Sequence, residues 1–219
     1  MRRLLDRIDW FVPILACVLV PCASSGPLGA QTLRITSPAD GAVVSPGDKI
    51  TVTVEVSGGS VPFVALGIEN PIGYSEILPA APYQFSVQIP SRVSLRRYPV
   101  YAGFVGKGKE GSVAAIFIDV ERPDGPTKLE VEPSLLVPTA GTIGYLSAYA
   151  TYVDSTRVEV TQSTLTRWSS DSPGVAAVSD LGVVTAIRPG SAKIFVQNGG
   201  QTAIVPVTVS KKRAGDLKP

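Results

Sequence analysis

The chain has 219 residues, with 20 basic side chains, 18 acidic side chains and no histidine. The missing histidine excludes Ser-His-Asp and Cys-His catalysis, and it removes the commonest protein metal ligand. The small net charge, without a basic groove interleaved with aromatic residues, argues against nucleic acid as a partner. Because Val, Thr, Gly and Pro are frequent and charged residues are few, we predict strands rather than helices.

The segment 1–30 has the order of a secretory signal peptide: basic residues, an apolar run, then small residues. We predict cleavage between Ala30 and Gln31. The apolar run is about half the ~20 residues that cross a bilayer as a helix, so no stable membrane span is expected after cleavage. Two alternatives remain, an uncleaved anchor and a lipoprotein modified at Cys17.

Both cysteines, Cys17 and Cys22, lie in this predicted signal peptide. The exported chain would therefore have no thiol, no disulfide and no cysteine-based zinc site, although export usually permits disulfides. We expect its domains to be held by apolar cores alone. The expected location is the extracellular medium, the cell surface or the periplasm.

The rest of the chain is predicted to contain two domains, at 31–122 and 128–210. The linker at 123–127 carries an Asp-Gly turn signal between prolines. A basic tail follows at 211–219. Its simplest interpretation is a solvated end, and the alternative is contact with anionic polymer at the cell surface.

Five segments of the first domain alternate apolar and polar residues, which is typical of half-buried strands. With an opening strand at 33–37 they predict six or seven strands and hence a sandwich. One of Tyr98 and Tyr101 is a candidate for the tyrosine that pins a corner of such sandwiches through its hydroxyl, and a ligand-contacting aromatic is the alternative. The alternating segments are 50–57, 64–68, 83–89, 98–104 and 114–120.

The second domain repeats this pattern of short apolar runs and turns, and its specific sequence motifs add information. It contains Trp168-Ser169-Ser170, Val175-Ala176-Ala177-Val178, Gly182-Val183-Val184-Thr185-Ala186 and Gly190-Ser191-Ala192-Lys193-Ile194, after Asp154 and the pair Val160-Thr161. These motifs resemble those of the bacterial immunoglobulin-like (Ig-like) domain of group 2, the repeated module of invasin- and intimin-type surface proteins. The resemblance covers nearly all of 128–210 and implies an Ig-like sandwich with a role in adhesion. The opening at 33–41 resembles other bacterial Ig-like modules less specifically.

The strand segments predicted for this domain include two whose boundaries matter below, 134–137 and 144–152. The others are 128–131, 164–169, 175–179, 183–188, 192–197 and 202–209.

Three residues of the second domain are predicted to be structural. Trp168 is expected in the core of the sandwich, where burial of its ring contributes about 4–6 kcal/mol at most, and a ligand-stacking aromatic is the alternative. Gly182 and Gly190 are expected in tight turns that need a positive φ.

The acidic residues raise one metal hypothesis. Asp119 with Glu121, and Glu130 with Glu132, are separated by two residues, so each pair is expected on one solvent-facing side of a strand. The alternative is a calcium site, because carboxylate oxygens are the ligands that calcium prefers. No calcium-loop motif is present, so we predict no metal and no cofactor. The candidate calcium ligands are Asp124, Glu130, Glu132, Asp154 and Asp171.

The sequence therefore predicts an all-β protein: two tandem Ig-like β-sandwiches after an N-terminal signal peptide. The expected function is non-enzymatic, in cell-surface adhesion or extracellular recognition of a protein or polysaccharide partner. One alternative is a structural spacer or accessory subunit of a cell-envelope assembly. The other is a polysaccharide-binding module associated with an enzyme.

Overall fold

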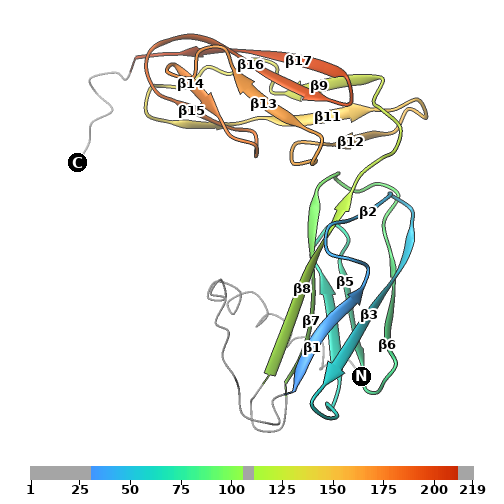
Figure 1. The fold of residues 1–219 in the computed structure, drawn as a ribbon. Coiled ribbons are helices and arrows are strands. Elements are labelled where there is room, and N and C mark those ends of the chain that lie inside the picture. The colour runs from blue at the N-terminus through green and yellow to red at the C-terminus, as the bar shows by residue number, and fades with distance from the viewer. Residues whose placement is uncertain (1–30, 106–110, 212–219) are drawn as a thin grey trace, which may run out of the picture. The chain divides into compact units, whose positions relative to one another are not determined.

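The structure, a computed structural model, describes residues 31–105 and 111–211. The predicted signal peptide and most of the basic tail lie outside these residues. The described chain is all-β and contains strands β1 to β17 (Figure 1). Among the described residues no helix is long and apolar enough to span a membrane.

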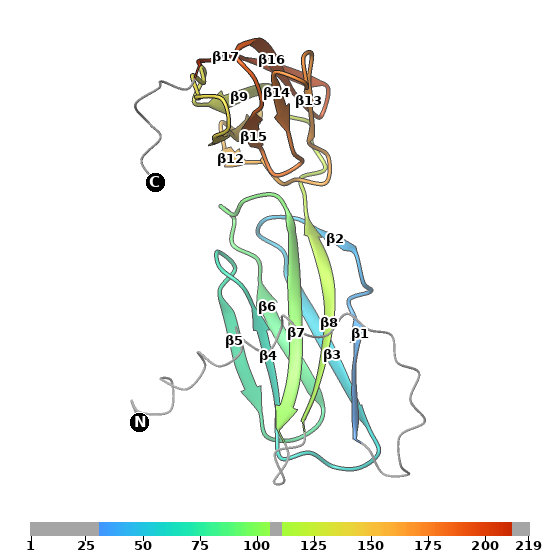
Figure 2. The ribbon, with the colours of Figure 1, turned by 90° about the vertical axis from the view of Figure 1, so that its left-hand side faces the viewer.

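Strands β1 to β8 build the first sandwich from two sheets. One sheet has the order β1-β3-β6 and the other has the order β2-β8-β7-β4-β5 (Figure 2). All pairs are antiparallel except β2 with β8. The strands are β1 (Thr32–Ser37), β2 (Ala42–Val44), β3 (Lys49–Ser57), β4 (Val64–Ile68), β5 (Tyr74–Leu78), β6 (Tyr83–Gln88), β7 (Arg97–Val105) and β8 (Gly111–Val120).

The core of this sandwich is formed by the apolar residues of the alternating segments. Val52 of β3, Phe85 of β6 and Val100 of β7 are fully buried between the two sheets. Tyr98 occupies the corner before the body of β7, and its hydroxyl donates a hydrogen bond of 2.9 Å to the carbonyl of Ser94. Of the two tyrosines considered from the sequence, Tyr98 is therefore the corner residue. Burial raises the pKa of its hydroxyl.

Two strands of the first sandwich were not predicted, β2 and β5. In β5 only the two end residues are partly buried and the three between them are exposed, so the segment has no inward alternation to detect. It is an edge strand, held by β4 on one side only. β2 has three residues, and its pairing with β8 depends on a segment far along the chain.

Strands β9 to β17 build the second sandwich. The sheets have the orders β12-β11-β9, β10-β15-β14 and β13-β16-β17. The longest pairing is the hairpin of β16 and β17, which continues from Gly190–Val209 to Asn198–Gln201. The strands are β9 (Lys128–Glu132), β10 (Ile143–Tyr145), β11 (Ser147–Thr151), β12 (Arg157–Glu159), β13 (Arg167–Ser170), β14 (Ala176–Val178), β15 (Val183–Ala186), β16 (Gly190–Asn198) and β17 (Gln201–Val209).

Two predicted strands of this domain differ in the structure. The segment 144–152 is divided at Leu146, which is buried and donates its N–H to the carbonyl of Gly182, so β10 and β11 join different sheets. The segment 134–137 is not a strand but makes an isolated bridge from Leu136 to Val207. Pro133 and Pro138 flank it, and proline has no N–H to donate to a ladder.

Candidate functional site

A groove lies at one end of the first sandwich, where β3 leaves its sheet and the chain passes from β5 to β6. It is open to solvent, has a volume of about 690 Å³ and is lined only by residues of this sandwich. One wall is the end of β3 and the turn after it, and the other wall is the β5–β6 connection and the start of β6. We call it the β3–β6 groove, and its lining residues are 53–57, 59–61 and 79–83.

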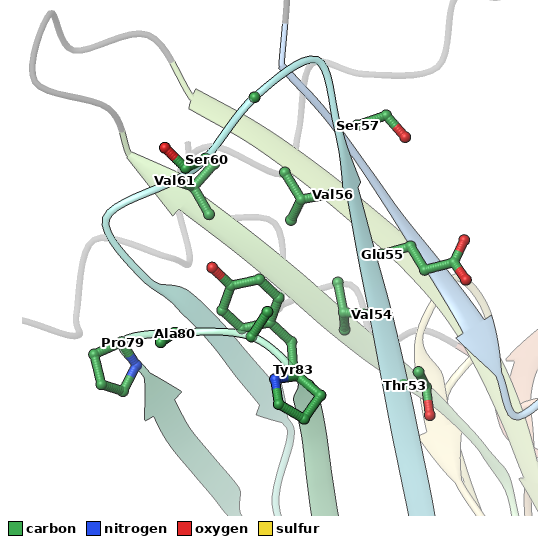
Figure 3. A pocket seen from close by; sticks show the side chains of 13 residues that line it. Thr53, Val54, Glu55, Val56, Ser57, Ser60, Val61, Pro79, Ala80 and Tyr83 are labelled. Carbon is green, nitrogen blue, oxygen red and sulfur yellow. The ribbon is translucent and has the colours of Figure 1, made fainter.

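The floor of the β3–β6 groove is apolar. Figure 3 shows the ring of Tyr83 between Val56 and Val61 on one side and the Pro79–Ala80 segment on the other. Glu55 and Ser57, which alternate with Val56 along β3, point to the other side of the strand in the same view. The only carboxylate of the lining is thus directed away from the floor.

This geometry fits binding better than catalysis. The volume falls within the range of ordinary ligand pockets, about 300–1,000 Å³. A groove with an apolar floor, hydroxyl groups at its rim and loops for walls can hold an extended segment by shape and by contact with apolar groups. Its lining holds no pair of a nucleophile and a base. Sequence reasoning missed this groove, and its only local signal is the run Pro79-Ala80-Ala81-Pro82 between two strands.

The structural residues predicted from the sequence lie in the second sandwich. Trp168 is buried in β13, and its Nε1–H donates to the carbonyl of Thr161 at 3.1 Å. Gly182 has a φ of +72°, and a Cβ added there would lie 2.3 Å from the carbonyl oxygen of Leu146 and 3.3 Å from the Trp168 ring. Gly190 has a φ of +151° and packs against Val175. None of these residues lines the β3–β6 groove.

The prediction that Asp119 and Glu121 share a solvent-facing side of a strand is wrong. Only 7% of Asp119 and 6% of Glu121 is exposed. Asp119 is covered by Arg97, its cross-strand neighbour, which donates two hydrogen bonds of 2.7 and 2.9 Å to it. Glu121 lies just beyond the end of β8.

Glu121 is bound by the loop between β12 and β13. Its carboxylate accepts hydrogen bonds from the hydroxyl of Ser163 at 2.9 Å and from the backbone N–H of Thr164 at 2.8 Å. The hydroxyl of Thr164 donates a further bond of 3.0 Å. The amide of Asn198 supports the loop through the hydroxyl of Thr166. A buried carboxylate is thus hydrogen-bonded by three donors, as burial of a charge requires.

The next residue, Arg122, which precedes the predicted linker, is also held by its side chain. Its guanidinium pairs with Asp124 at 2.8 Å and Asp154 at 3.1 Å, and it stacks 4.2 Å above the ring of Tyr152. The hydrogen bond from Arg122 lowers the pKa of Asp124. The pKa of Asp154 is lowered mainly by the backbone N–H of Thr156, with a smaller contribution from Arg122. Burial raises the pKa of Tyr152 to about 12.

The five candidate calcium ligands are not gathered into one site. Asp124 and Asp154 meet around Arg122, a cation that already neutralises them. Glu130 and Glu132 pair with Arg157, and Glu130 also pairs with Lys128. Asp171 accepts the backbone N–H of Lys193. Within residues 31–105 and 111–211 no group of three potential metal-ligating side chains is present.

Comparison with known families gives one match. Residues 164–211 match the family described as bacterial Ig-like domain. This segment runs from the loop before β13 through the end of β17, so it contains the hairpin and the Trp168 strand. No curated protein is significantly similar to the chain.

Solved structures resemble the chain weakly. The fibronectin(III)-like modules of CbhA from Clostridium thermocellum are 15% identical, with a TM-score of 0.35, over 85% of this chain and 97% of theirs. Domains 1–6 of the surface layer protein SbsC are 15% identical, with a TM-score of 0.37, over 87% of this chain and 29% of theirs. The all-β assignment rests on the strand pairing described above.

Proposed function

We propose that this chain is an exported, non-enzymatic Ig-like protein that recognises a protein or polysaccharide partner at the cell surface. The observation that carries the proposal is the β3–β6 groove, an apolar-floored recess of about 690 Å³ built by loops on a rigid sandwich. The match of residues 164–211 to bacterial Ig-like domains supports it, because such modules occur in surface proteins. We further propose that the second sandwich belongs to group 2 and that residues 1–30 direct export.

Recognition by this groove follows from its chemistry. An extended segment that enters it can place an apolar side chain against Val56, Val61 and Tyr83. The hydroxyl group of Ser60 lies at the rim and can exchange hydrogen bonds with the partner. The strands beneath keep the walls in place, so little ordering entropy is lost on binding.

The test is affinity capture with the chain from Gln31 to Pro219. The baits are envelope extract of the producing organism and, in parallel, host matrix proteins and polysaccharides. The expected result is one saturable ligand that is lost in Val56→Gln, which puts a polar amide into the groove. Ser57→Gln is the matched control, because it adds the same side chain on the other side of β3.

Two results would count against this function. If Val56→Gln and Ser57→Gln bind equally well, the groove is not the recognition site. If the chain captures only one endogenous envelope protein and no foreign ligand, its role is that of a structural or accessory subunit.

A further inference from the structure

The last residues of β3 lie at a free edge of their sheet. The ladder between β3 and β6 ends where Val54 pairs with Tyr83, the first residue of β6. β3 itself continues to Ser57, paired with β1. Figure 3 shows Val56 and Ser57 beyond the level at which β6 begins. This end of β3 is thus paired on one side only, and its other side borders the β3–β6 groove.

The register shows which backbone groups of β3 are directed toward this free side. Successive residues of an antiparallel strand direct their N–H and C=O alternately to the two neighbouring strands. Just before β3, the carbonyl of Asp48 accepts the N–H of Ile89 at 2.8 Å, so Asp48 faces the β6 side. Every second residue from there, at positions 50, 52, 54 and 56, therefore directs its N–H and C=O to the β6 side.

The backbone of Val56 therefore lacks a strand partner. The other side of β3 agrees with this alternation, because Thr36 of β1 donates its hydroxyl to the carbonyl of Thr53, an odd-numbered position. In the part of the chain that the structure describes, no hydrogen bond outside the ladders reaches the N–H or C=O of Val56. Backbone groups are strong hydrogen-bonding groups, so Val56 offers one donor and one acceptor to a ligand in the groove.

We propose that the β3–β6 groove binds an extended polypeptide segment, which pairs with Val56 as an added β-strand. The N–H and C=O of one strand residue match the C=O and N–H of a peptide, as in other cases where a segment adds to a sheet edge. In this mode main-chain hydrogen bonds hold the segment, and pockets for alternate side chains select its sequence. The inference rests on the proposed function, recognition by this groove, and names the class of its partner.

The floor of the groove selects one side chain of the added strand. A segment residue opposite Val56 lies on the same face of the sheet as Val56, so its side chain is directed toward Val61 and Tyr83. The residues before and after it lie on the face of Glu55, which points away from the floor in Figure 3. We therefore expect an apolar residue between two polar ones.

The same floor disfavours a polysaccharide. Sugar hydroxyls that leave water need new hydrogen-bonding partners, and their burial without partners costs free energy. The floor consists of Val56, Val61 and the ring of Tyr83, and the carboxylate of Glu55 is directed elsewhere. A polypeptide can place an apolar side chain there while its backbone pairs with Val56.

A peptide library tests the class of partner directly. Random seven-residue peptides displayed on phage are panned against the chain from Gln31 to Pro219, and an oligosaccharide array is screened in parallel. We expect peptides with an apolar residue between polar ones, which bind the wild type and Ser57→Gln but not Val56→Gln. An oligosaccharide lost in Val56→Gln would refute the polypeptide and leave recognition by the groove standing. If neither screen gives a ligand sensitive to Val56→Gln, both proposals fail.

Val56→Pro tests the backbone pairing separately from the side chain. Proline has no N–H, and it is tolerated at a strand edge where that N–H would face outward. Binding of the selected peptide should weaken at least about tenfold, because a peptide carbonyl loses its donor. Val56→Ile keeps the N–H and an apolar branched side chain, so it should bind like the wild type. Thermal melts check that both variants fold, and equal binding by the two would refute the pairing.

Hydrogen exchange followed by NMR needs no variant. In the unbound protein the N–H of Val56 should exchange faster than that of Val54, which is bonded in the ladder. The selected peptide should slow exchange at Val56. A Val56 N–H that is already protected without peptide would overturn the proposal, and so would one that the peptide leaves unchanged.

Methylation of the peptide amides gives the complementary result. Only one N–H of the bound segment faces the carbonyl of Val56, and the N–H groups next to it point away from β3. Methylation of that one amide should weaken binding at least about tenfold, and methylation of its two neighbours should cost less. A peptide that tolerates methylation equally at every position would show that it binds through side chains alone and would refute the added strand.

Discussion

At the residue scale, Gly182 and Gly141 have the same backbone conformation in different surroundings. Both belong to the second sandwich, with φ values of +72° and +86°. A Cβ at Gly141 would meet nothing within 4 Å, whereas a Cβ at Gly182 would collide with the carbonyl oxygen of Leu146. A left-handed backbone alone costs an alanine about 1–2 kcal/mol, and forced overpacking adds about 1–3 kcal/mol.

We therefore expect Gly182→Ala to lower the free energy of unfolding by about 3 kcal/mol and Gly141→Ala by about 1 kcal/mol. Urea unfolding followed by tryptophan fluorescence measures both, because Trp168 is the only tryptophan after residue 30. Equal losses in the two variants would mean that the packing around Gly182 and Trp168 is looser than described.

The same residues show which features of the structure could be predicted from the sequence and which could not. Gly182 was predicted to be a turn glycine from its sequence motif. Its φ is positive, as such a turn requires. The contact of Gly182 with Leu146 was not predicted, because Leu146 lies in a different strand segment and its position depends on how β10 and β11 divide. The burial of Glu121 was not predicted for a similar reason: its partners are 42 and 43 residues away.

At the scale of elements, Glu121 attaches the linker to the β12–β13 loop. Removal of its carboxylate leaves the N–H of Thr164 and the hydroxyl of Ser163 without this acceptor in a buried place. A buried donor without a partner costs about 1–3 kcal/mol. Glu121→Ala should therefore lower the stability of the second sandwich by about 2–3 kcal/mol.

Glu132→Ala is the control, because Glu132 pairs with Arg157 at an exposed position. Exposed pairs contribute about 0–1 kcal/mol, so this variant should remain close to the wild type. The urea concentrations at the unfolding midpoints of the two variants test this prediction. A loss in Glu121→Ala no larger than that in Glu132→Ala would argue that the linker does not hold the loop in solution.

The linker cluster around Arg122 gives a pH dependence with a defined sign. The pKa values of Asp124 and Asp154 are lowered in the folded protein. A carboxylate with a lowered pKa stabilises the fold above its unfolded pKa of about 3.9, and this contribution is lost as the pH falls through the folded value. The second sandwich should therefore lose stability below about pH 4.

Arg122→Gln should make this acid loss smaller, mainly because Asp124 loses its hydrogen-bonded cation. Arg188→Gln is a suitable control, since Arg188 donates to the carbonyl of Gly174. Unfolding midpoints between about pH 5 and pH 2.5 at low ionic strength give the comparison, because both carboxylates are about half exposed and salt screens them. The same acid slope in wild type and Arg122→Gln would contradict the assignment.

Edge strands explain the elements that sequence reasoning missed. Long strands such as β3 and β7 were predicted because one face of each is buried and the other faces solvent. Apolar and polar residues therefore alternate along these strands. β5 has no such contrast, since it covers little of the core. β8 reads Val113-Ala114-Ala115-Ile116-Phe117-Ile118, apolar at both inward and outward positions.

At the scale of the whole molecule, the strand pairing divides the described strands into two groups, and the backbone N–H of Leu95 donates to the carbonyl of Glu159 between them. Strands β1 to β8 pair among themselves, and so do β9 to β17. With no cysteine after residue 30, each unit depends on its own apolar core. The pattern of alternation predicted these two groups of strands, but it did not predict that Glu121, at the end of the predicted first domain, is bound by the second group.

The fragments 31–120 and 121–211 should therefore each unfold in one cooperative transition. Moving the start of the second fragment from residue 121 to 123 removes Glu121 and Arg122. We expect the shorter fragment to unfold at a lower urea concentration, by about the loss caused by Glu121→Ala, because it lacks the same hydrogen bonds. Circular dichroism follows the first fragment and Trp168 fluorescence follows the second. If the two versions of the second fragment unfold together, the energetic boundary lies after Arg122, and Glu121 belongs to the first unit despite its contacts.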